Sequence, residues 1–124
     1  MSAGAALQAA VAAALEGVDG LEGVYDGAPA RAAFPYVVID CGQESDWGHK
    51  SGAGREVLVA ATVWDDQQSR LYGLADAVEA VLLNAVGVEG WQLVSRALVR
   101  RRVVRDVAGP WASAIDVRAR LLAH

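Results

Sequence analysis

The apolar residues near the start of the chain follow a helical rhythm. They recur three and four positions apart from Ala3 to Leu15, with Ser2 before them and Gly17 after them. This spacing places them on one face of an amphipathic helix. Ser2 is a typical N-cap residue and Gly17 a typical stop, so the pattern predicts a first helix over residues 3–15.

The same rhythm returns in the middle of the chain and predicts a second helix. Asp65 and Gln68 have the spacing of a capping box, and helix-spaced apolar residues follow as far as Gly87. These apolar positions are Leu71, Leu74, Ala75, Val78, Leu82 and Ala85. Gly73 disfavours a helix interior by about 1 kcal/mol relative to alanine, so we expect it to permit a close backbone approach.

Strands are predicted between the two helices. A short one surrounds Val24 and Tyr25, and "PYVVIDCG", from Pro35, is rich in β-branched and aromatic residues. The segment 55–64, "REVLVAATVW", alternates in the period of two that is typical of a strand. One of its faces would carry Val57, Val59, Ala61 and Val63. Gly42–Gly54 has no apolar period and is predicted to be a loop.

The last third of the chain predicts a long β-hairpin. The segments "WQLVSRALVRRRVVRD" and "WASAIDVRARLLA" are separated by the turn signal "VAGP". One face of the second strand would carry Trp111, Ser113, Ile115, Val117, Ala119 and Leu121. The order of elements predicts a single α+β domain over residues 1–124. In it, an antiparallel sheet of about four strands carries two helices on one face and ends in the hairpin.

Composition adds a division of charge to this picture. A chain of 124 residues with net charge −4 is long enough for one buried core. Residues 1–90 carry four basic and thirteen acidic residues, whereas residues 91–124 carry seven arginines and two aspartates. With Cys41 as the single cysteine, no disulfide forms within one chain. The N-terminal apolar run is too short for a membrane span of about 20 residues, so we expect a soluble, unexported, cytoplasmic protein.

The segment "DCGQESDWGH", residues 40–49, is the densest group of side chains capable of chemistry. A small metal-dependent enzyme would use Asp40, Cys41, Glu44, Asp46 and His49. However, Cys41 and His49 form neither a CxxC pair nor a helical zinc motif. Polar residues flanked by glycine are more typical of a solvated loop, and Cys41 of a buried strand end. The nearby "GHKSGAGR" lacks the order of a phosphate-binding loop.

The basic run of the hairpin comprises Arg100, Arg101, Arg102 and Arg105. Alternation along a strand puts Arg100 and Arg102 on one side, and Arg101 and Arg105 on the other. Such a run would suit a nucleic-acid-binding module. The second interpretation is a solvated hairpin tip, or ion pairs with the acidic part of a neighbouring copy. The second interpretation is favoured because no aromatic residue alternates with the arginines and the net charge is negative.

Three segments together resemble a known family. They are "VYDGAPARAAFPYVVID", "VLVAATVWDDQQSRLYGLADAVEAVLLNAV" and "LVSRALVRRRVVRDVAGPWASAIDVRARL". In this order they are similar to the tail-completion, or tail-terminator, proteins of long-tailed phages, prophages and gene-transfer-agent particles. The resemblance implies a structural protein that forms a hexameric ring on the head-proximal end of the tail tube. The ring would join the tube to head-completion proteins and let DNA pass without specific binding. Catalysis, a cofactor, a metal and a membrane partner are not implied.

The residues that would contact partner proteins are predicted from their chemistry. In the polar loop they are Trp47, His49, Lys50 and Arg55, and in the hairpin they are Arg100, Arg101, Arg102 and Arg105. An exposed aromatic side chain can anchor an interface, and unlike charges on two parts of one chain favour head-to-tail contacts between copies.

Overall fold

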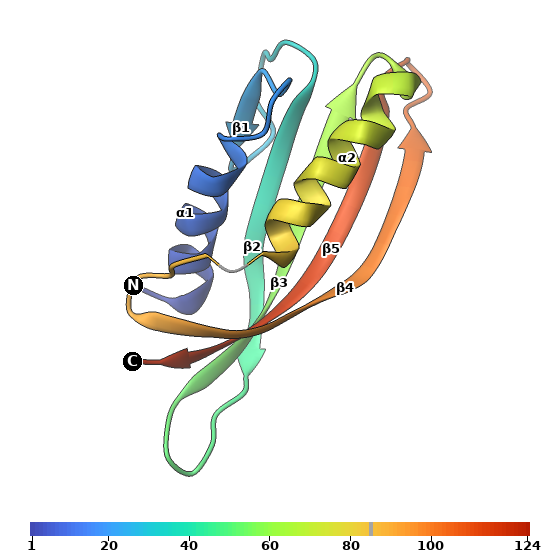
Figure 1. Cartoon of the computed structure of the whole chain (residues 1–124). Helices are drawn as coiled ribbons and strands as arrows, with labels where there is room; N and C mark the ends of the chain where they lie inside the picture. Colours follow the sequence, from blue (N-terminus) through green and yellow to red (C-terminus); the bar gives the residue numbers. More distant parts are fainter. Residues whose placement is uncertain (85) are drawn as a thin grey trace.

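Two helices pack on one face of a five-stranded sheet (Figure 1). The computed structural model describes residues 1–84 and 86–124. In chain order its elements are α1 (Ala3–Leu15), β1 (Gly23–Tyr25), β2 (Tyr36–Asp46), β3 (Gly54–Asp65), α2 (Gln68–Leu83), β4 (Trp91–Arg105) and β5 (Trp111–Ala123). The predicted α+β class and closing hairpin are confirmed, and the sheet has one strand more than the four expected.

The strands lie in the order β1-β2-β3-β5-β4. β2, β3, β5 and β4 pair antiparallel, as predicted, whereas the short β1 runs parallel to β2, with Gly23 opposite Tyr36. β4 therefore forms one edge of the sheet. At the other edge β1 covers only Tyr36–Val38, so no strand of the described residues pairs with the outer side of most of β2.

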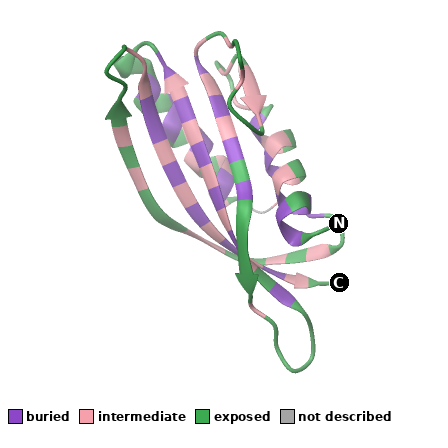
Figure 2. Ribbon diagram, turned by 180° about the vertical axis from the view of Figure 1, so that it is seen from behind, coloured by how far each residue is buried: buried purple, intermediate pink, exposed green. Residues whose placement is uncertain are grey.

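The core lies between the helices and the sheet, and the alternation of β3 and β5 locates it. The predicted inward positions of β3 are fully buried, as are those of β5 from Ser113 onward, and Trp111 is half-buried. Leu7 and Leu15 of α1 and Leu71 of α2 pack onto this face. Figure 2 views the second face of the sheet, which neither α1 nor α2 covers and where the residues between the buried ones are half-exposed. In the part of the chain that the structure describes, no helix is long and apolar enough to cross a membrane.

The predicted loop over Gly42–Gly54 is confirmed for residues 47–53 and wrong at its two ends, because both flanking strands extend into it. β2 continues to Asp46 and β3 begins at Gly54, so residues 47–53 connect them. A bulge between Asp40 and Gln43 shifts the register, after which Gln43–Asp46 still pair with β3. These four paired residues are all exposed, so the apolar alternation that reveals a strand is missing.

α1 forms as predicted and approaches β2 closely. The Ser2 hydroxyl accepts a hydrogen bond from the Ala5 N–H (3.2 Å), which confirms the N-cap. A Cβ added at Gly4 would lie 2.6 Å from both the Cys41 carbonyl oxygen and a Glu44 carboxylate oxygen. Only glycine fits at this crossing, which the helical pattern did not predict.

α2 begins differently from the prediction. Its N-cap is Gln67, and the expected capping box of Asp65 and Gln68 is not formed. The buried Asp65 instead accepts two hydrogen bonds of 2.7 Å from the Arg70 guanidinium and one from the Gln67 N–H. Burial by itself raises the pKa of Asp65, but these hydrogen bonds outweigh it, and the pKa lies below its ordinary value of 3.8.

Two further expectations about α2 are settled by its bounds and surroundings. Gly73 is not a site of close approach, because a Cβ added there would meet nothing within 4 Å. The helix ends at Leu83, short of the expected Gly87. Ala85, predicted on its apolar face, lies outside the described residues.

Candidate functional site

The connection between β2 and β3 brings two of the predicted loop residues together. The Trp47 and His49 rings pack edge-on with centroids 4.8 Å apart. The turn is closed by hydrogen bonds from Trp47 N–H to the Gly54 carbonyl and from His49 N–H to the Gly52 carbonyl. The Arg120 guanidinium lies 5.5 Å from the Trp47 ring centroid. Trp47 is thus half-buried against the sheet by a cation–π contact.

The other two loop residues are placed apart from this pair. Arg55 lies on β3 and reaches back to β2, with its guanidinium 3.6 Å from Glu44 and 3.5 Å from Asp46. Lys50 is exposed in the turn. Of the four predicted loop residues, Trp47 and His49 form a contact, Arg55 belongs to an ion-pair network, and Lys50 projects into solvent.

The residues proposed for a metal-dependent enzyme do not converge. Asp40 accepts a hydrogen bond from the Gly42 N–H, and Glu44 accepts one from the Gly4 N–H of α1. Among residues 1–84 and 86–124, no group of three His, Cys, Asp or Glu side chains is placed to hold a metal ion. Burial, with a further contribution from Asp40, raises the pKa of the Cys41 thiol to about 12. The thiol therefore stays protonated near neutral pH and is a poor nucleophile.

The hairpin arginines divide between two sides of β4, as alternation predicts. Arg101 faces α2, where its guanidinium donates hydrogen bonds to Asp76 (2.8 Å) and Glu79 (3.3 Å). Arg100 faces the other side and donates to Asp116 on β5 (3.0 Å). Two of the four cations are therefore paired with carboxylates of the same chain.

The remaining two arginines lie closer to the tip of the hairpin. Arg105 stacks on its cross-strand partner Trp111, with its guanidinium 5.1 Å from the ring centroid. Arg102 is exposed and has no hydrogen-bond or ion-pair partner among the described residues. The basic surface available to a partner is thus smaller than the run of four arginines indicated, which weakens the interpretation as a nucleic-acid-binding module.

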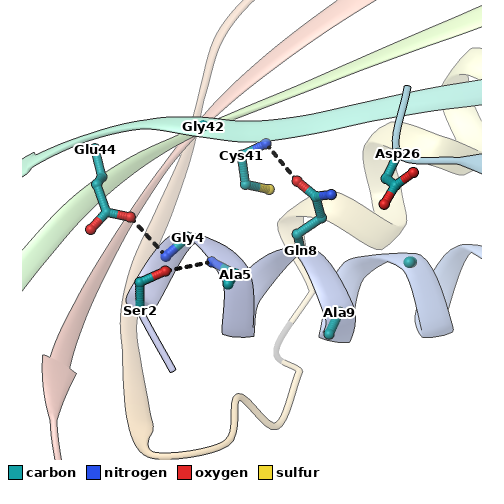
Figure 3. A pocket seen from close by; sticks show the side chains of 10 residues that line it. Ser2, Gly4, Ala5, Gln8, Ala9, Asp26, Cys41, Gly42 and Glu44 are labelled. Atoms are coloured by element: carbon teal, nitrogen blue, oxygen red, sulfur yellow. Dashed lines mark hydrogen bonds between the residues drawn. The ribbon is translucent and has the colours of Figure 1, made fainter. Parts of the chain in front are cut away.

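A groove between α1 and β2 was not predicted from the sequence (Figure 3). It has a volume of about 460 Å³. Its lining residues are Ser2, Gly4, Ala5, Gln8, Ala9, Ala12, Asp26, Cys41, Gly42 and Glu44. The Gln8 side-chain oxygen accepts a hydrogen bond from the Cys41 N–H (3.1 Å), which ties the helix to the strand. The one available signal was that α1 contains no charged residue.

A comparison with solved structures gives this architecture a context. The chain matches one from a structure described as the virion of a native gene transfer agent particle, with 27% sequence identity and a TM-score of 0.84. The match covers 99% of this chain and 100% of the other. No curated protein matches the chain.

The sequence profile of a family described as tail completion protein gp17 matches residues 3–122. This range includes both helices and all five strands of the sheet, apart from the last residue of β5. The resemblance found in the three sequence segments is therefore confirmed over nearly the whole domain. The chain belongs to the tail completion protein gp17 family, and its role is a structural one in tail assembly.

Proposed function

We propose that this protein closes the head-proximal end of a tail tube as a ring of copies, six in the expected assembly, and joins the tube to head-completion proteins. DNA passes through the channel of the ring without specific binding. The observation that carries the proposal is the match, over 99% of the chain, to a chain within a gene transfer agent virion. The protein would accordingly be found in the finished phage-like particle.

The connection from β2 to β3 is the proposed contact with tube or head-completion proteins. Residues 47–53 extend beyond the part of the sheet that the helices cover (Figure 1). Trp47 is held at the base of this projection, while His49 and Lys50 are exposed. A half-buried aromatic residue beside exposed polar ones is a typical arrangement for an interface anchor and its rim. Arg55 supports the projection from β3.

The hairpin is the proposed contact between copies. Of the four predicted hairpin arginines, Arg102 and Arg105 have no carboxylate partner among the described residues, so they can meet acidic groups of a neighbour. Arg100 and Arg101 are paired internally and would mainly hold β4 against β5 and α2. A ring requires one surface of each copy to meet a different surface of the next, and unlike charges on the two surfaces favour this arrangement.

The experiment is multi-angle light scattering with negative-stain imaging, on the protein alone and mixed with the tail-tube protein encoded nearby. Closed rings, or caps on tube ends, are the expected result. A protein that stays monomeric and leaves tube ends bare would contradict the proposal.

A further inference from the structure

The outward side of α1 is unusual for a surface helix. A helix that covers a sheet normally carries polar residues on its solvent side. α1 has no charged residue, and its exposed positions are Ala5, Ala9 and Ala13. This side of the molecule therefore presents methyl groups to solvent, next to the groove between α1 and β2.

The groove combines these methyl groups with acidic ends. Figure 3 shows Glu44 near one end, Asp26 near the other, and Gln8 reaching β2 between them. Asp26 has no hydrogen-bond or ion-pair partner in the described part of the chain. The volume of about 460 Å³ is in the range of small-molecule pockets, roughly 300–1,000 Å³. Small-molecule pockets are lined mainly by large apolar side chains with a few converging polar groups. The alanines and glycines in the lining of this groove leave an open surface instead, which suits a protein loop.

The tip of the β4–β5 hairpin has the complementary chemistry. Val107 is fully exposed, and Ala108 beside it is exposed as well. The tip is held in shape by Asp106, whose side chain accepts a hydrogen bond from the Ala108 N–H (3.1 Å) and whose carbonyl accepts one from Gly109 N–H (3.0 Å). Arg105 directly precedes this turn and lacks a carboxylate partner.

The groove and the tip lie on opposite sides of the molecule. Figure 1 shows α1 and β2 at one side of the sheet and the turn between β4 and β5 at the other. One copy can therefore offer its tip to a second copy while its own groove receives the tip of a third. A contact of this head-to-tail type closes into a ring when the rotation between copies permits.

We propose that the groove between α1 and β2 receives the hairpin tip of a second copy, with Val107 and Ala108 against the alanines and Arg105 beside Asp26. This inference rests on the proposed function for the association of copies, and it specifies which surfaces meet. The apolar tip removes methyl groups of both copies from water. Glu44 is already paired with Arg55, so the attraction of Arg105 to Asp26, unpaired among the described residues, fixes the direction of insertion.

The test is disulfide trapping in assembled protein. Ala9→Cys and Val107→Cys are combined in a Cys41→Ala background, so that no native thiol competes. Under mild oxidation we expect covalent dimers and higher ladders that disappear on reduction. The matched control combines Val107→Cys with Ala80→Cys, an exposed alanine on α2, and should give no ladder. Assembled protein that forms no ladder with the first pair, or equal ladders with both, would overturn the inference.

A charge exchange provides a second measurement that does not depend on cysteine chemistry. Arg105→Asp and Asp26→Arg should each reduce the assembled fraction in light scattering, and the double variant should restore it. If the double variant assembles even less than either single variant, so that the two losses of assembled fraction add, the contact between Arg105 and Asp26 is contradicted. Rings that form without these contacts would leave the proposed function in place and remove only this inference. Disulfide-trapped ladders together with bare tube ends would support this contact between copies and contradict the proposed function.

Discussion

The two helices cover the same face of the sheet, yet their outward sides differ in charge. α2 carries Arg70, Asp76 and Glu79, and each of them forms an ion pair with another part of the chain. α1 carries no charge, and its solvent side is alanine. The outward side of α2 is therefore suited to contact with water, whereas that of α1 is suited to cover by another protein surface.

Their inward contacts differ as well. α1 crosses β2 closely at Gly4 and is tied to the strand by Gln8 and Glu44. α2 is held at its first turn by the pair of Asp65 and Arg70. Beyond the apolar core that they share, α1 is thus anchored by a close backbone approach and α2 by an ion pair.

The largest expected effect comes from the core that both helices share. Leu7→Ala in α1 and Leu71→Ala in α2 each remove a fully buried side chain. Each should lower the free energy of unfolding by about 2–5 kcal/mol, because a cavity adds to the lost transfer free energy. Urea unfolding followed by circular dichroism measures this. If only one of the two variants has a lower free energy of unfolding, the helix that carries the other substitution is not part of a common core.

Acid should distinguish the charged anchor of α2. The pKa of Asp65 is lower in the folded state than its ordinary value of 3.8, so its contribution is present above that pH and is lost as pH falls through the folded pKa. Asp65→Asn should cost about 1.5–3 kcal/mol at pH 7, as expected for hydrogen bonds to a charged group. Urea unfolding at pH 7 and pH 3 measures the difference in free energy of unfolding between the wild-type protein and Asp65→Asn. This difference should be smaller at pH 3. The same difference at both pH values would contradict the role of the charged Asp65 carboxylate in anchoring α2.

Glycine-to-alanine substitutions in the two helices should have opposite signs. Gly73→Ala meets no atom within 4 Å and should stabilise the protein by about 1 kcal/mol through helix propensity. Gly4→Ala places a methyl group 2.6 Å from the Cys41 carbonyl oxygen, so it should destabilise the protein despite any gain in helix propensity. Thermal unfolding of both variants provides the measurement. Stabilisation by both would show that α1 can move away from β2 freely.

The sequence was informative where one face of an element is buried and the other is not. The alternation of Val57 to Val63 located the core face of β3, and Ser2 marked the start of α1. The same rule failed for Gln43–Asp46, because a strand segment exposed on both faces has no apolar period. Asp65 was assigned to a cap because its spacing to Gln68 is local, while its real partner Arg70 depends on how the turn folds.

The groove was beyond prediction for a different reason. Its hydrogen bonds join Gln8 to Cys41 and Gly4 to Glu44, residues that are 33 and 40 positions apart. No local pattern specifies such pairs, since they depend on the register with which α1 crosses β2. In the hairpin, alternation assigned the sides of β4 correctly, but it could not show that Arg101 meets Asp76 of α2.

The most direct test of this account compares one substitution on the two helices. Ala9→Glu places a charge on the outward side of α1, and Ala80→Glu places the same charge on the exposed side of α2. Both should change the stability of the isolated protein by no more than about 0.5 kcal/mol, as is usual for surface positions. Light scattering and imaging with the tail-tube protein should show assembly lost in Ala9→Glu and retained in Ala80→Glu. Equal assembly of the two variants would contradict the claim that α1 is covered in the particle.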